Sequence, residues 1–95
     1  MTYADSWERE SLIKGLRALA DYLEENPSLP TPIYETIHAF PPDDGDWAEM
    51  CGEIDNVAAI LGTPTFMSPG GHYGTARYFG PVAYRAVAIP VKETE

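Results

Sequence analysis

The sequence has little positive charge. Six Lys and Arg stand against 15 Asp and Glu, which gives a formal net charge of −9, and residues 18–76 contain no Lys or Arg at all. A nucleic-acid-binding surface neutralises phosphates with basic side chains, and anionic membrane surfaces attract the same side chains. We therefore expect neither direct nucleic-acid binding nor membrane binding.

Cysteines and long apolar runs are also scarce. Cys51 is the single cysteine, which excludes an intramolecular disulfide and a cysteine-based zinc cage. The longest unbroken apolar run is Val57–Leu61, far shorter than the roughly 20 residues that a membrane span needs. The first residues lack the basic and apolar regions of a signal peptide, so we expect a cytoplasmic protein.

The length of 95 residues and the hydrophobic fraction of 44% fit one globular domain, residues 1–95, with a modest core. Such a small domain leaves little room for a deep cleft with a complete catalytic apparatus. This favours a non-enzymatic protein, and we assign no catalytic residues, no metal site and no cofactor.

Two helices are predicted, each by a capping box followed by an apolar stripe. Asp5 with Glu8 predicts a helix at 6–25, which Asn26-Pro27 ends. Asp46 with Glu49 predicts a second helix at 46–61, with Gly62 as the C-terminal glycine. The stripe of the first helix is made by Leu12, Ile13, Leu16, Leu19, Ala20 and Leu23, and that of the second by Trp47, Met50, Ile54, Val57, Ala58 and Leu61.

The remaining segments read as β structure. Residues 33–40 predict a strand, in which either Ile33 and Ile37 or Tyr34 and Phe40 face the core. Residues 65–67 are compatible with a further short strand, and 72–89 predict an antiparallel hairpin around Gly80-Pro81. The predicted class is α+β, in the order α-β-α-(β)-β-β, with two helices packed on one face of a small antiparallel sheet.

Three side chains could carry chemistry if the fold brought them together. Cys51 with His38 or His72 could form an activated thiolate or, with nearby acids, a metal site. The spacing does not place either histidine beside the cysteine, and a cysteine next to the apolar stripe of a helix is usually a core residue.

The hairpin is the first candidate interaction surface. Tyr and Arg are enriched at protein interfaces, and both strand faces carry bulky groups. We expect a non-catalytic protein–protein interaction module that binds an unknown protein partner or a second copy of itself. Its candidate residues are Tyr73, Arg77, Tyr78, Phe79, Tyr84 and Arg85.

An acidic face is the alternative. Its carboxylates could imitate the DNA backbone and bind a basic host protein, as a phage-type inhibitor does. The candidate residues are Asp43, Asp44, Asp46, Glu49 and Glu53. The competing interpretation is a solvated face whose acids cap the second helix and keep the protein soluble.

Two stretches carry a resemblance. Residues 16–32 (LRALADYLEENPSLPTP) and 71–90 (GHYGTARYFGPVAYRAVAIP) resemble small uncharacterised acidic proteins of actinobacteria and of their phages or mobile elements. The resemblance spans most of the chain. It implies a cytoplasmic, phage-associated protein and assigns no activity, ligand or site residue.

Overall fold

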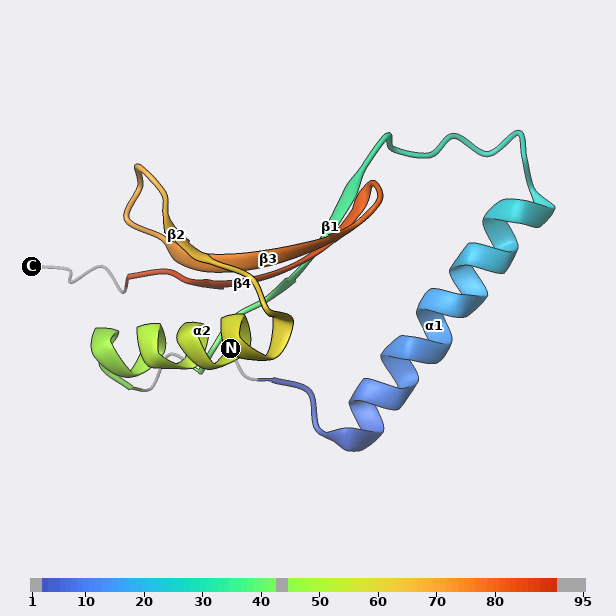
Figure 1. Cartoon of the computed structure of the whole chain (residues 1–95). Coiled ribbons are helices and arrows are strands. Elements are labelled where there is room, and N and C mark those ends of the chain that lie inside the picture. The colour runs from blue at the N-terminus through green and yellow to red at the C-terminus, as the bar shows by residue number, and fades with distance from the viewer. Residues whose placement is uncertain (1–2, 43–44, 91–95) are drawn as a thin grey trace, which may run out of the picture. The chain divides into compact units, whose positions relative to one another are not determined.

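A computed structural model describes residues 3–42 and 45–90 of the chain (Figure 1). It has two helices and four strands in the order α-β-α-β-β-β, which confirms the predicted α+β class and element order. The contacts divide the chain into two compact units: residues 4–33, and a second unit to which Tyr3 and residues 34–42 and 45–90 belong. The single domain predicted from the length stays a prediction.

The unit of residues 4–33 contains helix α1 (Ser6–Glu25) and the proline-rich segment after it. The predicted capping box is present. The Asp5 carboxylate accepts a 2.8 Å hydrogen bond from the Glu8 backbone N–H, and the Glu8 carboxylate accepts one of 3.0 Å from Asp5. Asn26 ends the helix by donating its backbone and side-chain N–H groups to the Tyr22 carbonyl.

The second unit contains one sheet and one helix. Strand β1 spans Glu35–Ala39, helix α2 Trp47–Leu61, β2 Thr65–Met67, β3 Tyr73–Phe79 and β4 Val82–Ala88. These bounds agree with the predicted ones to within two residues. Neither helix of the described residues has the length and apolar character that crossing a membrane requires.

The sheet has the strand order β1-β4-β3-β2 and is mixed, because β1 pairs with β4 in parallel. The prediction of an antiparallel sheet is therefore wrong for the β1–β4 pair. The chain passes from β1 through α2 before it returns to the sheet, and a crossover that contains a helix is the connection that parallel neighbours use. The β2–β3 and β3–β4 pairs are antiparallel, as predicted for the hairpin.

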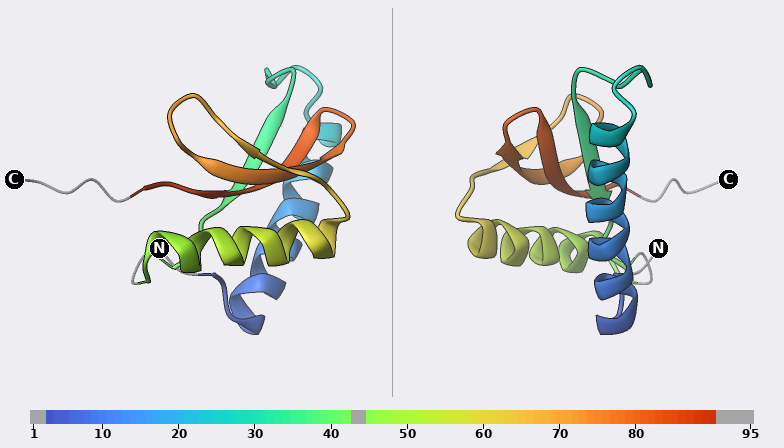
Figure 2. Two further views of the ribbon diagram at one scale, coloured as in Figure 1. Left: turned by 60° about the vertical axis from the view of Figure 1, so that its left-hand side comes forward. Right: turned by 90° about the vertical axis from the view of Figure 1, so that its right-hand side faces the viewer.

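Helix α2 lies across one face of this sheet, as both views in Figure 2 show. The core cluster joins Met50 and Ile54 of α2 to Ala86 and Ala88 of β4. The small alanine side chains let the helix approach the strand closely. Whether α1 also packs on this face, as the sequence predicts, stays a prediction.

The register of β1 settles which of its residues face the core. Ile37 pairs with Tyr84, and Ala39 with Ala86. Paired residues of neighbouring strands point to the same face, so Ile37 and Ala39 lie on the α2 side. His38 pairs with Arg85, and both lie on the opposite face.

Two glycines permit the turns that end α2 and join β3 to β4. Gly62 caps the C-terminus of α2 at φ 68°, as predicted, and its N–H donates to the Ala58 carbonyl. Gly80 has φ 63° and is the first of the two residues between Phe79 and Val82. Two-residue hairpin turns with glycine first are favourable, and the fixed negative φ of Pro81 suits the second position.

Thr75 is a buried polar residue of β3, with 0% exposure. Its hydroxyl donates a 3.0 Å hydrogen bond to the Pro64 carbonyl. Since that hydroxyl has one proton, the Thr63 hydroxyl, 2.6 Å away, is the donor in the contact between the two threonines. This chain of hydrogen bonds fixes the segment between α2 and β2 on the sheet.

Candidate functional site

Exposed apolar side chains gather where β3 turns into β4, next to the start of β1. Tyr78 is 74% exposed, Phe79 59% and Val82 44%. Tyr34, 74% exposed, precedes Glu35, whose backbone N–H donates to the Pro81 carbonyl in the turn. We call Tyr34, Tyr78, Phe79 and Val82 the hairpin tip. Tyr78, Phe79 and Val82 belong to the paired strands β3 and β4, and Tyr34 directly precedes the first residue of β1 that pairs with β4.

Arg77 supports the hairpin tip from the side of α2. Its guanidinium lies 5.6 Å from the centroid of the Phe79 ring, within the range of a cation–π contact. The same group donates a 3.2 Å hydrogen bond to the Leu61 carbonyl at the end of α2. The last turn of α2 contains no basic residue of its own, so Arg77 is placed where a cation complements the helix dipole.

Two of the six predicted hairpin residues turn inward. Tyr73 and Tyr84 are half-buried and pack against the core cluster. The Tyr73 hydroxyl donates a hydrogen bond of 2.5 Å to the Asp55 carboxylate of α2, and this bond raises the pKa of Tyr73 above its ordinary value. The structure therefore gives both tyrosines a packing role.

Arg85 lies on the sheet face opposite α2. Its guanidinium stacks on the Phe66 ring, 4.8 Å from the centroid. The Phe66 ring lies on Gly74, where a Cβ would come within 3.0 Å of the ring. The buried Arg85 Nε atom has no hydrogen-bond partner among the described residues. Arg85 thus lies on the same sheet face as Tyr78 of the hairpin tip, but its guanidinium is engaged by the Phe66 ring.

Tyr34 and Val82 belong to the hairpin tip but were not predicted to do so. The sequence predicts that Tyr34 belongs to a strand in which either Tyr34 and Phe40 or Ile33 and Ile37 face the core. The sequence offered one signal that Tyr34 lies outside the core. It stands close after the proline-rich segment and before the regular strand β1 begins. Val82 is placed there by the two-residue turn.

The predicted acidic face is partly committed to helix capping. The Asp46 carboxylate accepts a 2.8 Å hydrogen bond from the Glu49 N–H, and the Glu49 carboxylate accepts one of 3.3 Å from the Asp46 N–H. Glu53 lies one turn further along α2. Asp43 and Asp44 lie outside the described residues.

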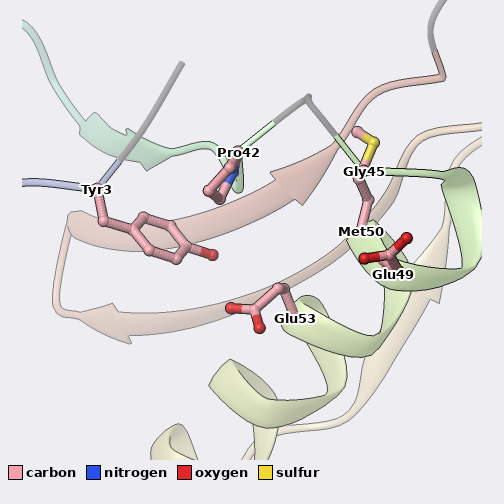
Figure 3. A pocket seen from close by; sticks show the side chains of 6 residues that line it. All are labelled: Tyr3, Pro42, Gly45, Glu49, Met50 and Glu53. Carbon is pink, nitrogen blue, oxygen red and sulfur yellow. The ribbon is translucent and has the colours of Figure 1, made fainter.

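Glu49 and Glu53 also line an open cavity of about 300 Å³ in the second unit. Figure 3 shows the Tyr3 ring along its wall, with the hydroxyl directed toward the Glu53 side of the cavity. Burial, with smaller contributions from Glu53 and Tyr84, raises the pKa of Tyr3. The other lining residues are Pro42, Gly45 and Met50.

The structure does not bring His38, Cys51 and His72 together. His38 lies on the sheet face opposite α2 and stacks on Phe40, with ring centroids 6.0 Å apart. Cys51 belongs to α2, where burial and, to a smaller extent, Asp55 raise the pKa of its thiol. The His72 backbone N–H donates to the Ser68 hydroxyl. No group of three His, Cys, Asp or Glu within residues 3–42 and 45–90 is arranged to hold a metal ion.

Comparison with known proteins adds no further constraint on the site. No family model, curated protein or solved structure matches the chain. The resemblance to actinobacterial and phage proteins stays a prediction.

Proposed function

We propose that the chain is a non-catalytic protein–protein interaction module that binds its partner through the hairpin tip. The observation that carries this proposal is the exposure of Tyr34, Tyr78, Phe79 and Val82 at one end of the sheet. Exposed apolar groups that gather in one region mark interaction sites on soluble proteins, and aromatic residues with arginine are the groups that interfaces favour.

The construction of the hairpin tip supports the same role. Rigid aromatic side chains bury a large area and lose little conformational entropy on binding. Tyr78 and Phe79 are consecutive residues of a strand, so they project to opposite sides of the hairpin. A partner that encloses the turn would contact both rings, with Tyr34 and Val82 completing the apolar surface.

The acidic alternative has weaker support. Asp46 and Glu49 engage each other's backbone, and a carboxylate that caps a helix is not free to reorient toward a partner. The inhibitor of a basic host protein therefore stays a prediction from the sequence. Its test is charge reversal at Glu53, which would weaken binding of such a partner and would reduce its dependence on salt.

The hairpin tip is tested by affinity capture with three forms of the full chain. These are the wild type, a Tyr78→Ser/Phe79→Ser variant and a Trp7→Ser control, which removes an aromatic side chain of equal exposure, 74%, from α1. We expect that the wild type and the control capture the same partner proteins, and that the double variant fails to capture them. Their affinity for the double variant, measured by calorimetry, should be at least about tenfold weaker, as for interface hot spots.

Two results would refute this proposal. One is a partner that binds the double variant as tightly as the wild type. The other is a partner lost equally from the Trp7→Ser control, because the loss would then not depend on the hairpin tip. Circular dichroism and thermal unfolding establish that each variant is folded before its binding is compared.

A further inference from the structure

Helix α1 carries an apolar stripe that nothing within its own unit covers. Leu12 is 51% exposed, Leu16 40% and Leu19 53%. With the half-buried Leu23, they follow one another at intervals of four, three and four residues. This is the spacing of the a and d positions of a coiled coil, which places all four leucines on one seam.

The residues that flank this seam alternate between large and small. On one side lie Ile13 and Ala20, and on the other Gly15 and Tyr22. A Cβ built on Gly15 would meet no atom within 4 Å apart from its chain neighbours and the nearby backbone of the helix itself, so this position has open space beside the seam. The Tyr22 side chain, 55% exposed, is a bulky group on the same side of the helix, seven residues further along.

Charge is divided between the two halves of α1. Residues 6–17 contain Arg9, Lys14 and Arg17 with two acids, whereas residues 18–25 contain three acids, Asp21, Glu24 and Glu25, and no base. The helix therefore has a weakly basic first half and an acidic second half. A second copy of α1 that runs in the opposite direction would place its acidic half against the basic half of the first copy.

We propose that α1 docks on the α1 of a second copy in antiparallel orientation. A seam centred between Arg17 and Ala18 pairs Leu16 with Leu19 of the second copy and Leu12 with its Leu23. In antiparallel pairs, each flank faces the same flank of the other helix. Tyr22 of the second copy then enters the space beside Gly15, and Ile13 lies against its Ala20.

A parallel pair of α1 helices would not bring large and small flanking residues, or opposite charges, together. It would place Arg9, which lies on the seam one turn before Leu12, opposite its own copy, and like charges in register are destabilising. It would also bring the acidic halves together and leave Gly15 facing Ala20, two small residues. The helix dipoles oppose a parallel pair and favour an antiparallel one.

The first test is the concentration dependence of the mass of the full chain, measured by sedimentation. A seam of about two heptads is short for a specific interface, so we expect reversible dimers at micromolar concentration. Leu19→Arg should weaken this association at least tenfold. Ala18→Arg adds the same side chain at the adjacent exposed position, off the seam, and should leave it unchanged.

The second test determines the orientation and does not depend on a charged substitution. In a Cys51→Ser background, Leu12→Cys and Leu23→Cys lie at opposite ends of the seam, about 16 Å apart along the helix at 1.5 Å per residue. Mixing the two variants under mild oxidation should give cross-linked heterodimers. Neither variant alone should cross-link efficiently, because in the antiparallel pair each cysteine faces position 23 or 12 of the other copy.

Three outcomes would overturn this proposal. They are a strict monomer over the whole concentration range, a dimer that Leu19→Arg leaves intact, and cross-linking of each single variant with itself. None of them bears on the hairpin tip, which belongs to the other unit and is tested by different variants. If both proposals hold, the dimer presents two hairpin tips and binds a bivalent partner with increased avidity.

Discussion

The Tyr73 hydroxyl of β3 donates a 2.5 Å hydrogen bond to the Asp55 carboxylate of α2, 18 residues earlier in the chain. This contact links the sheet to the helix at the edge of the core cluster. A hydrogen bond from a hydroxyl to a carboxylate is among the stronger kinds in proteins. It also couples the stability of the second unit to the protonation of one tyrosine.

The first prediction concerns stability at alkaline pH. The bond to Asp55 raises the Tyr73 pKa above 10.0 in the folded state, so the folded state holds this proton more tightly than the unfolded chain. The resulting stabilisation is complete below pH 10 and is lost as the pH rises through the folded-state pKa. Urea unfolding of the wild type should show a free energy that falls above pH 10, and Tyr73→Phe should make this fall shallower.

Tyr78→Phe is the matched control, because the Tyr78 side chain is 74% exposed and its hydroxyl makes no hydrogen bond to the described residues. It should leave both the stability at pH 7 and the slope above pH 10 unchanged. An equal effect of the two substitutions would show that the Tyr73–Asp55 bond does not contribute.

The second prediction concerns the buried hydroxyl of Thr75. Thr75→Val keeps the shape of the side chain but removes the donor to the Pro64 carbonyl and the acceptor for Thr63. Leaving buried polar groups without partners costs about 1–3 kcal/mol. The free energy of unfolding should fall by this amount in urea denaturation. Thr36→Val, whose hydroxyl has no hydrogen-bond partner among the described residues, should change it by less than about 0.5 kcal/mol.

The local parts of the fold were predictable from the sequence because their signals lie within a few residues. Asp5 with Glu8 and Asp46 with Glu49 marked both helix starts, and Gly62 marked the end of α2. The hairpin followed from two strand-like runs on either side of Gly80-Pro81. In each case one short segment contains all the groups whose hydrogen bonds define the feature.

The parallel pairing of β1 and the division of the hairpin residues were not predictable in this way. Both depend on which strand β1 joins and which face α2 covers, and these are contacts between distant segments. Tyr73 and Arg85 both belong to the predicted hairpin, and the sequence contains no signal that assigns them to different faces of the sheet. Only the position of α2 directs Tyr73 to Asp55 and leaves Arg85 on the opposite face.

The third prediction concerns the contact between two β strands at Gly74. A Cβ at this position would lie 2.9 Å from the Ala86 carbonyl oxygen and 3.0 Å from the Phe66 ring. The carbonyl is backbone in the neighbouring strand and cannot move without disturbing the ladder. Gly74→Ala should therefore destabilise the chain by about 1–3 kcal/mol, the usual cost of overpacking, measured as a lower midpoint of urea unfolding.

Gly52→Ala is the control for the same substitution in open space. Gly52 lies inside α2, and a Cβ there meets nothing within 4 Å. Alanine is favoured over glycine in a helix by up to about 1 kcal/mol, so this variant should be more stable than the wild type. If both substitutions changed the stability in the same direction, the close approach at Gly74 would be disproved.

The fourth prediction distinguishes a packing role of Cys51 from a reactive one. Burial first, and the Asp55 carboxylate second, raise the pKa of its thiol above 9.0, which lowers the fraction of thiolate at neutral pH. Because the thiolate is the nucleophile, the folded protein should react with iodoacetamide at pH 8 several-fold more slowly than a short cysteine peptide. In urea its rate should approach that of the peptide. A rate above that of the peptide would instead indicate an activated thiol and would favour the enzymatic reading of Cys51 over the proposed interaction module.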